Sequence, residues 1–119
     1  MSQNFQPGDF LVFQLEAGYA LLRLLAIEGQ DEEKIWHLAA YDDFYLDVEM
    51  AEAAIGRSIQ LRMSQPHLAL STRAFESTQV AKIANIPLNE AETVPLAEWR
   101  SDPSREVSDK SVRLLLGLR

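Results

Sequence analysis

The fold is decided by residues 7–28, which read PGDFLVFQLEAGYALLRLLAIE. Phe10–Leu15 is a short apolar run, and Tyr19–Ile27 is a second one, which is stopped by Gly29. Two such runs joined by a short link that contains Gly18 predict a β-hairpin. Both faces of the second run are apolar except at Arg23, so we expect the hairpin to be buried on most of both sides.

A helix is the competing interpretation of the second run. Ala, Leu and Arg are strong helix formers, and they dominate residues 20–26. The ten residues between Gly18 and Gly29 are, however, few for a helix and ordinary for a strand. We therefore expect a strand.

The composition predicts one soluble domain. The chain has 119 residues, of which 47% are hydrophobic and 24% are charged, so it can bury a core of its own. No basic leader with an apolar core begins the sequence, and no run of about 18 apolar residues interrupts it. There is no cysteine, which excludes disulfides, thiol nucleophiles and Cys-ligated metals. We expect a cytoplasmic protein, neither exported nor inserted in a membrane.

The charge of the chain is negative and unevenly placed. The formal net charge is −7, and residues 28–52 hold nine of the eighteen acids with one base, Lys34. This distribution argues against nucleic-acid binding. It leaves two interpretations open: a solvated face that keeps the protein soluble, or a surface for a basic partner.

The remaining pattern predicts further short strands and two short helices. Expected strands are Lys34–Tyr41, Ser58–Ser64, His67–Thr72 after a turn at Gln65-Pro66, Gln79–Ile86, and an edge segment Val94–Trp99 that contains Pro95. Expected helices are Val48–Ile55, capped by Asp47, and a C-terminal one from Ser108 with Val112, Leu115 and Leu116 on one face; Arg73–Glu76 forms a single helical turn. The fold class is α+β, with a curled antiparallel sheet or small barrel of five to seven strands.

No catalytic or cofactor motif is present. His37 and His67 lie on expected strands without the helical spacing of a metal pair, and there is no nucleophile elbow and no phosphate-binding loop. Asp42, Asp43 and Asp47 do not form a calcium loop, because residues 44–46 are apolar or aromatic. We expect no enzyme activity, no cofactor and no metal. The alternative is a small-ligand site or an enzyme pocket near His37 and His67.

The candidate partner-binding site is the acidic segment from residue 41 to residue 52. Its residues are Tyr41, Asp42, Asp43, Phe44, Tyr45, Asp47, Glu49 and Glu52. Aromatic anchors surrounded by carboxylates are typical of a site that binds a basic protein surface. The competing interpretation places Phe44 and one tyrosine in the core, with the acids flanking a turn.

Two separated pieces of the sequence resemble a known family. Residues 5–15 (FQPGDFLVFQL) with 18–25 (GYALLRLL), and residues 83–88 (IANIPL) with Pro95 downstream, are similar to bacterial immunity proteins of polymorphic toxin systems. Gln14 and Ala84 stand where that family has a proline and a glycine. The resemblance covers about a third of the chain. It implies stoichiometric binding and neutralisation of a toxin domain.

Overall fold

The hairpin expected from residues 7–28 forms the centre of the sheet. In the computed structural model, which describes residues 4–56 and 61–117, β1 (Asp9–Leu15) pairs antiparallel with β2 (Gly18–Glu28). Leu11 lies opposite Leu22, and Phe13 lies opposite Ala20. The strand prediction is confirmed and the helix interpretation is wrong, because apolar side chains fill both faces of β2.

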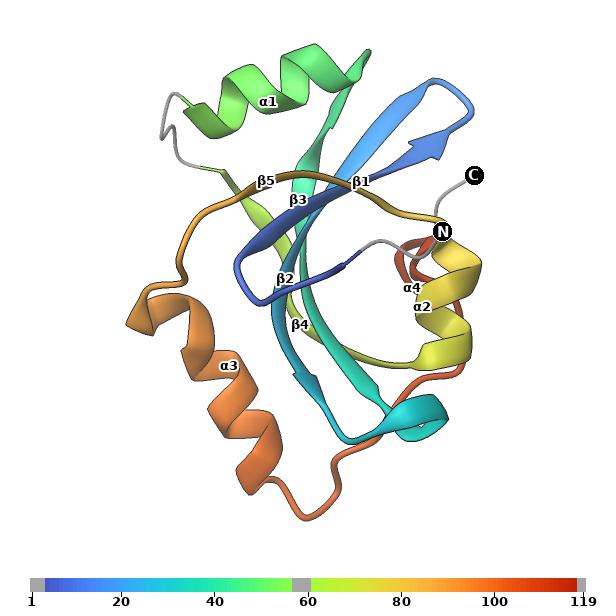
Figure 1. The fold of residues 1–119 in the computed structure, drawn as a ribbon, viewed down its shortest axis with the longest axis vertical. Helices are drawn as coiled ribbons and strands as arrows, with labels where there is room; N and C mark the ends of the chain where they lie inside the picture. The colour runs from blue at the N-terminus through green and yellow to red at the C-terminus, as the bar shows by residue number, and fades with distance from the viewer. Residues whose placement is uncertain (1–3, 57–60, 118–119) are drawn as a thin grey trace.

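Three further strands complete an open antiparallel sheet in the described part of the chain. They are β3 (Ile35–Tyr45), β4 (Met63–Ser71) and β5 (Ala81–Asn85); a short 3₁₀ turn, Asp31–Glu33, joins β2 to β3. The strand order is β4-β3-β2-β1-β5, so the last strand returns to pair with the first (Figure 1). β4 and β5 are the two edges, and the sheet is curled but not closed into a barrel.

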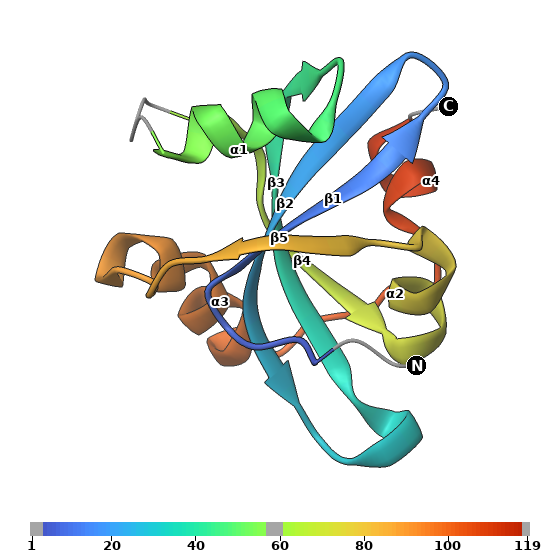
Figure 2. The same cartoon turned by 45° about the horizontal axis from the view of Figure 1, so that its top comes forward.

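Helices cover both faces of the curled sheet. α2 (Thr72–Thr78) and α4 (Val112–Leu116) lie on one face, whereas α1 (Val48–Gly56) and α3 (Glu90–Ser101) lie on the other (Figures 1 and 2). Since side chains alternate along a strand, β1 and β2 contribute to two cores. The first core contains Leu11, Phe13, Leu22, Leu24, Trp36, Leu38, Leu70, Phe75 and Val112. The second contains Phe10, Val12, Leu21, Tyr41, Ala51 and Ile55.

An aromatic cluster closes the first core. The rings of Trp36 and Phe75 stack 4.0 Å apart, and Phe5 meets both rings edge-on. The Trp36 indole N–H donates to Thr72 Oγ1 over 3.1 Å, which ties α2 to β3. Phe5 therefore anchors the start of the described chain on the first core.

The predicted helix capped by Asp47 is confirmed, whereas the predicted C-terminal helix begins at Val112, after Ser111, and not at Ser108. The backbone N–H of Met50 donates to Asp47 Oδ1 over 2.8 Å at the start of α1. α2 begins after Ser71, whose hydroxyl accepts the Ala74 N–H, and it is longer than the single turn expected. α4 ends at Gly117, whose positive φ of 67° suits a glycine.

The expected edge strand Val94–Trp99 is wrong, because these residues lie in α3. Asn89 and Glu92 form a capping box: Asn89 Oδ1 accepts the Glu92 N–H at 2.9 Å, and Glu92 Oε1 accepts the Asn89 N–H at 3.1 Å. Pro95 is the sixth of the twelve residues of this helix, so its missing N–H removes one backbone hydrogen bond. The cap outweighs that loss and starts a helix upstream of the proline. The described residues thus contain four α-helices, not two.

The expected turn at Gln65-Pro66 is also wrong. β4 runs without interruption from Met63 to Ser71, so two predicted strands are one. A proline is tolerated here because β4 is an edge strand. Of the expected strand Ser58–Ser64, residues 58–60 lie outside the described residues, and Leu61 and Arg62 precede β4.

Candidate functional site

The acidic segment lies where the end of β3 passes into α1, at the top of Figure 1. Three large apolar side chains are exposed there: Phe44 by 54%, Leu46 by 75% and Met50 by 47%. The carboxylates of the segment are exposed around them. We call this region the acidic–apolar surface, and it consists of Asp42, Asp43, Phe44, Leu46, Asp47, Glu49, Met50 and Glu52.

The two tyrosines predicted for the site lie differently from Phe44. Tyr41 is only 5% exposed and its ring stacks on Phe10, with 6.1 Å between centroids. Burial raises the pKa of Tyr41 to about 12. Tyr45 is half-buried against the second core. The prediction that Tyr41 offers its ring to a partner is therefore wrong, whereas Phe44 is available and is not a core residue.

The five carboxylates of the acidic–apolar surface have no basic partner in the described parts of the chain. Asp42, Asp43, Asp47, Glu49 and Glu52 form no ion pair with residues 4–56 or 61–117. Elsewhere acids do pair, as in Lys82–Asp9 and Arg23–Glu92. Asp47 also caps α1, so it has a structural role. Within residues 4–56 and 61–117, no ion pair compensates the negative charge of this surface, which attracts cations and basic groups.

The turn between β1 and β2 packs directly against the part of β3 that carries this surface. Tyr19 and Ala20 pair with Tyr45 and Phe44. A Cβ at Gly18 would lie 2.5 Å from the carbonyl oxygen of Tyr45, so only glycine lets the turn approach β3 this closely. The polar end of β3 is therefore held on a paired strand and not on a free loop.

The two histidines come together although they are distant in sequence. His37 on β3 is fully buried, and its Nδ1 lies 2.8 Å from Nε2 of His67 on β4. The imidazole rings stack, and the Trp99 ring from α3 meets His37 edge-on at 4.9 Å. Glu28 Oε1 lies 2.6 Å from His37 Nε2 but off the axis of the ring N–H, so the contact is close without being a well-formed hydrogen bond.

This arrangement does not form a metal centre or an open pocket. Nε2 of His37 lies against Glu28 and Nδ1 lies against His67. A single ion therefore does not reach all three groups. In the described residues, no cluster of three or more His, Cys, Asp or Glu side chains fits a metal. A hollow of about 410 Å³ lies elsewhere, and it is lined by Gln14, Leu15, Glu16, Gln79 and Arg113. His37 has no solvent-exposed surface, so it does not line an open pocket.

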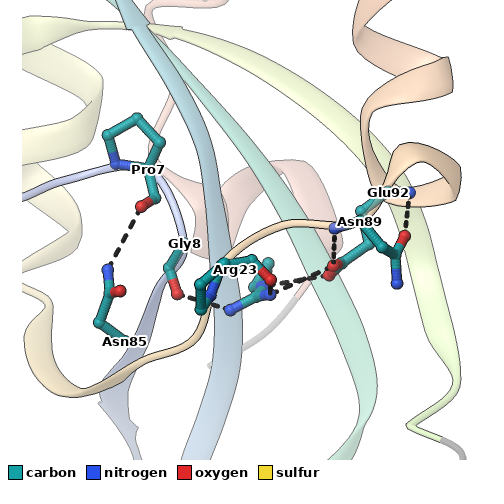
Figure 3. Close-up of polar contacts among 7 residues, drawn as sticks. Pro7, Gly8, Arg23, Asn85, Asn89 and Glu92 are labelled. Carbon is teal, nitrogen blue, oxygen red and sulfur yellow. Dashed lines mark hydrogen bonds and ion pairs between the residues drawn. The ribbon is translucent and has the colours of Figure 1, made fainter.

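A buried arginine joins three parts of the fold. Arg23, 2% exposed, donates Nε and Nη2 to the Glu92 carboxylate at 2.9 and 3.2 Å, and its Nη1 to the Gly8 carbonyl at 2.5 Å (Figure 3). Its guanidinium also lies over the Phe10 ring. All these partners belong to the chain itself. Arg23 therefore holds the start of α3 on the sheet, and it is a structural residue.

Leu46 and Met50 belong to the surface but were missed by sequence reasoning. Leu46 was not among the predicted site residues, and its 75% exposure follows from its place between β3 and α1. A signal existed for Met50: Val48, Ala51 and Ile55 form the inward face of α1, and Met50 falls outside that spacing. An apolar residue on the outer face of a capped helix indicates a contact surface.

Comparison of the chain with protein-family models, with curated proteins and with solved structures finds no match. The resemblance to immunity proteins therefore stays a prediction. The described helices, of which α3 with twelve residues is the longest, lack the length and apolar character of a membrane span. The functional argument rests on the geometry of the chain's own residues.

Proposed function

We propose that this protein is a non-catalytic binding module that holds a basic protein partner through the acidic–apolar surface. One observation carries the proposal: Phe44, Leu46 and Met50 are exposed within seven residues, among carboxylates that have no basic partner in the described residues. Apolar anchors bury area and slow dissociation, while surrounding charges speed encounter and select partners of opposite charge.

The resemblance to immunity proteins narrows the partner to a toxin domain. Stoichiometric binding by an acidic surface suits such a role, since a basic toxin surface would be neutralised without any catalytic group. A cytoplasmic location belongs to the same proposal, because the cysteine-free composition fits a reducing compartment. The alternative of a small-ligand or enzyme site at His37 and His67 is disfavoured, since His37 is fully buried and Trp99 of α3 packs on its ring.

Affinity capture with surface variants tests the proposal. The full chain is immobilised, and basic proteins captured from its source cells are compared with those captured by Phe44→Ser combined with Leu46→Ser. The matched control for charge is Glu76→Gln with Glu98→Gln, since both acids are exposed but lie on α2 and α3. We expect the partner to be lost with the apolar variant and retained with the control.

Binding kinetics then distinguish the contribution of the carboxylates from that of the apolar side chains. Asp42→Asn with Asp43→Asn should slow association, most strongly at low salt, because charge attraction is screened beyond about 8 Å at physiological ionic strength. Phe44→Ala should instead raise the dissociation rate about tenfold or more, as expected of an apolar anchor. Capture and kinetics that are unchanged in folded variants would show that the acidic–apolar surface is only a solvated face.

A further inference from the structure

Four elements meet around the histidine pair, His37 and His67. Glu28 from β2 approaches His37, and from α3 Trp99 covers both imidazoles while Arg100 Nε lies 3.2 Å from the same Glu28 carboxylate. Glu28 and Arg100 are the charged groups that act on the pair. The C-terminal half of α3 is thus attached to the sheet through the buried Leu96, through Trp99 on the two imidazoles and through the Arg100–Glu28 ion pair.

Only one hydrogen fits between the two imidazoles. Nδ1 of His37 and Nε2 of His67 lie 2.8 Å apart, so one nitrogen donates and the other must accept. His37 Nε2 lies 2.6 Å from the Glu28 oxygen and carries a hydrogen although the contact is poorly aligned, since a lone pair this close to a carboxylate would be repelled. A neutral His37 then accepts at Nδ1, and His67 donates its Nε2–H.

The closed arrangement resists protonation. A first proton would place a cation near Arg100, on a ring pair of which His37 is fully buried and His67 is half-buried. A second would put two N–H groups in opposition across 2.8 Å, which the stacked geometry does not allow. Burial lowers the pKa of both histidines; for His67, His37 and Arg100 lower it further, to about 4, while Glu28 raises it.

We propose that the histidine pair is an acid-sensitive latch that holds the C-terminal half of α3 on the sheet while the two rings share one hydrogen, and releases it when both become protonated. The open form exposes both rings to water, where each takes up a proton without restriction. A low pH therefore shifts the equilibrium toward the open form, because the two histidines together take up as many as two protons when α3 is released. This inference does not rest on the proposed function.

Release would be local, because the two ends of α3 are held differently. Arg23 and the capping box hold the start of α3 by contacts that do not involve the histidines. Trp99 donates its indole N–H to the Glu106 carbonyl at 3.0 Å, so the segment after the helix follows the movement of Trp99. The moving part is then residues 97–107, which follow the buried Leu96, and the hinge lies within α3.

The absence of cysteine makes a site-specific label straightforward. A spin label on Glu98→Cys reports on the exposed side of α3, and one on Glu76→Cys reports on α2 as the control. We expect the α3 label to become mobile as the pH falls from 6.5 toward 4, while the α2 label stays unchanged. The change should be weaker and should extend over a wider pH range in His67→Gln, whose amide still donates to His37 but takes up no proton, so that only His37 gains one on opening.

A second measurement uses the wild-type chain, so it tests the proposal even if His67→Gln does not fold. The chain has only two histidines, so ¹⁵N NMR of wild-type imidazoles reports the tautomers directly. We expect both rings to carry their hydrogen on Nε2 at pH 7, and to gain protons together with the label transition. Three results would overturn the proposal: an immobile α3 label with rings that titrate near 6.5, simultaneous release of both labels, or an unchanged transition in His67→Gln.

Discussion

At the scale of single residues, Arg23 and Glu92 show how a charge interrupts an apolar strand without marking a binding site. The Arg23 side chain is 3% exposed and the Glu92 side chain is 15% exposed, and their contact joins β2 to the start of α3. Buried charges require partners because desolvation is costly. Arg23 is the one interruption in the apolar pattern of β2, and its partner comes from a segment about seventy residues away.

Replacing Arg23 with Met should destabilise the protein by about 3 kcal/mol, because it leaves Glu92 partly buried without its cation. Urea unfolding monitored by circular dichroism measures the loss. The control is the double variant Arg23→Met with Glu92→Gln, in which we expect a smaller loss than the sum of the single variants. Strict additivity would show that the two groups do not interact.

Glu92 should also make stability depend on pH. Burial raises the pKa of this carboxyl, but the hydrogen bonds from Arg23 and from the Asn89 backbone outweigh burial and lower the pKa below its ordinary value of 4.5. The stabilisation is therefore present above pH 4.5 and is lost as the pH falls through the folded-state pKa. The difference in unfolding free energy between wild type and Glu92→Gln should shrink over that range. A difference that stays constant would contradict the assignment.

At the scale of elements, α4 shows that a short terminal helix can be part of the core. Val112 is fully buried and Leu115 and Leu116 pack beside it, although the helix spans only five residues. The Val112 N–H donates to Thr78 Oγ1 on α2, so the two helices support each other.

Truncation of the chain after Lys110 should lower the melting temperature, because it removes Val112 and exposes Phe75 and Leu70 in the first core. Differential scanning calorimetry measures the shift, and Leu114→Ser is the control because Leu114 is 69% exposed on the same helix. A truncated chain with the same melting temperature as the wild type would show that α4 does not contribute to the stability of the core.

At the scale of the whole molecule, the two cores lie on opposite faces of one sheet and share β1 and β2. Leu11 and Val12 are neighbours in sequence, yet they pack into different cores. Loss of the hairpin would therefore remove both cores at once, which predicts one cooperative domain.

The two tryptophans allow a test of this cooperativity. Trp36 is part of the first core, and Trp99 lies on α3 at the opposite face. In Trp36→Phe and Trp99→Phe, the remaining fluorescence should change at the same urea concentration as the circular dichroism of that variant. Separate midpoints for fluorescence and circular dichroism would show that the faces unfold independently.

The sequence by itself determined the elements whose signals are local. Apolar runs with Gly18 between them gave the hairpin, and Asp47, Ser71 and Gly117 marked helix ends, because turns and caps depend on a few neighbouring residues. The sequence also located the acidic segment. α3 was missed although its capping box is a local signal, because Pro95 was given more weight than Asn89 and Glu92.

Only the tertiary structure decided which residues of the acidic segment face solvent and which distant residues meet. Tyr41 and Phe44 are both aromatic, but β3 turns one toward Phe10 and leaves the other exposed at the end of the sheet. His37 meets His67, and Arg23 meets Glu92, through strand register and helix docking. Those contacts depend on the sum of many packing interactions across the molecule, so no short stretch of sequence specifies them.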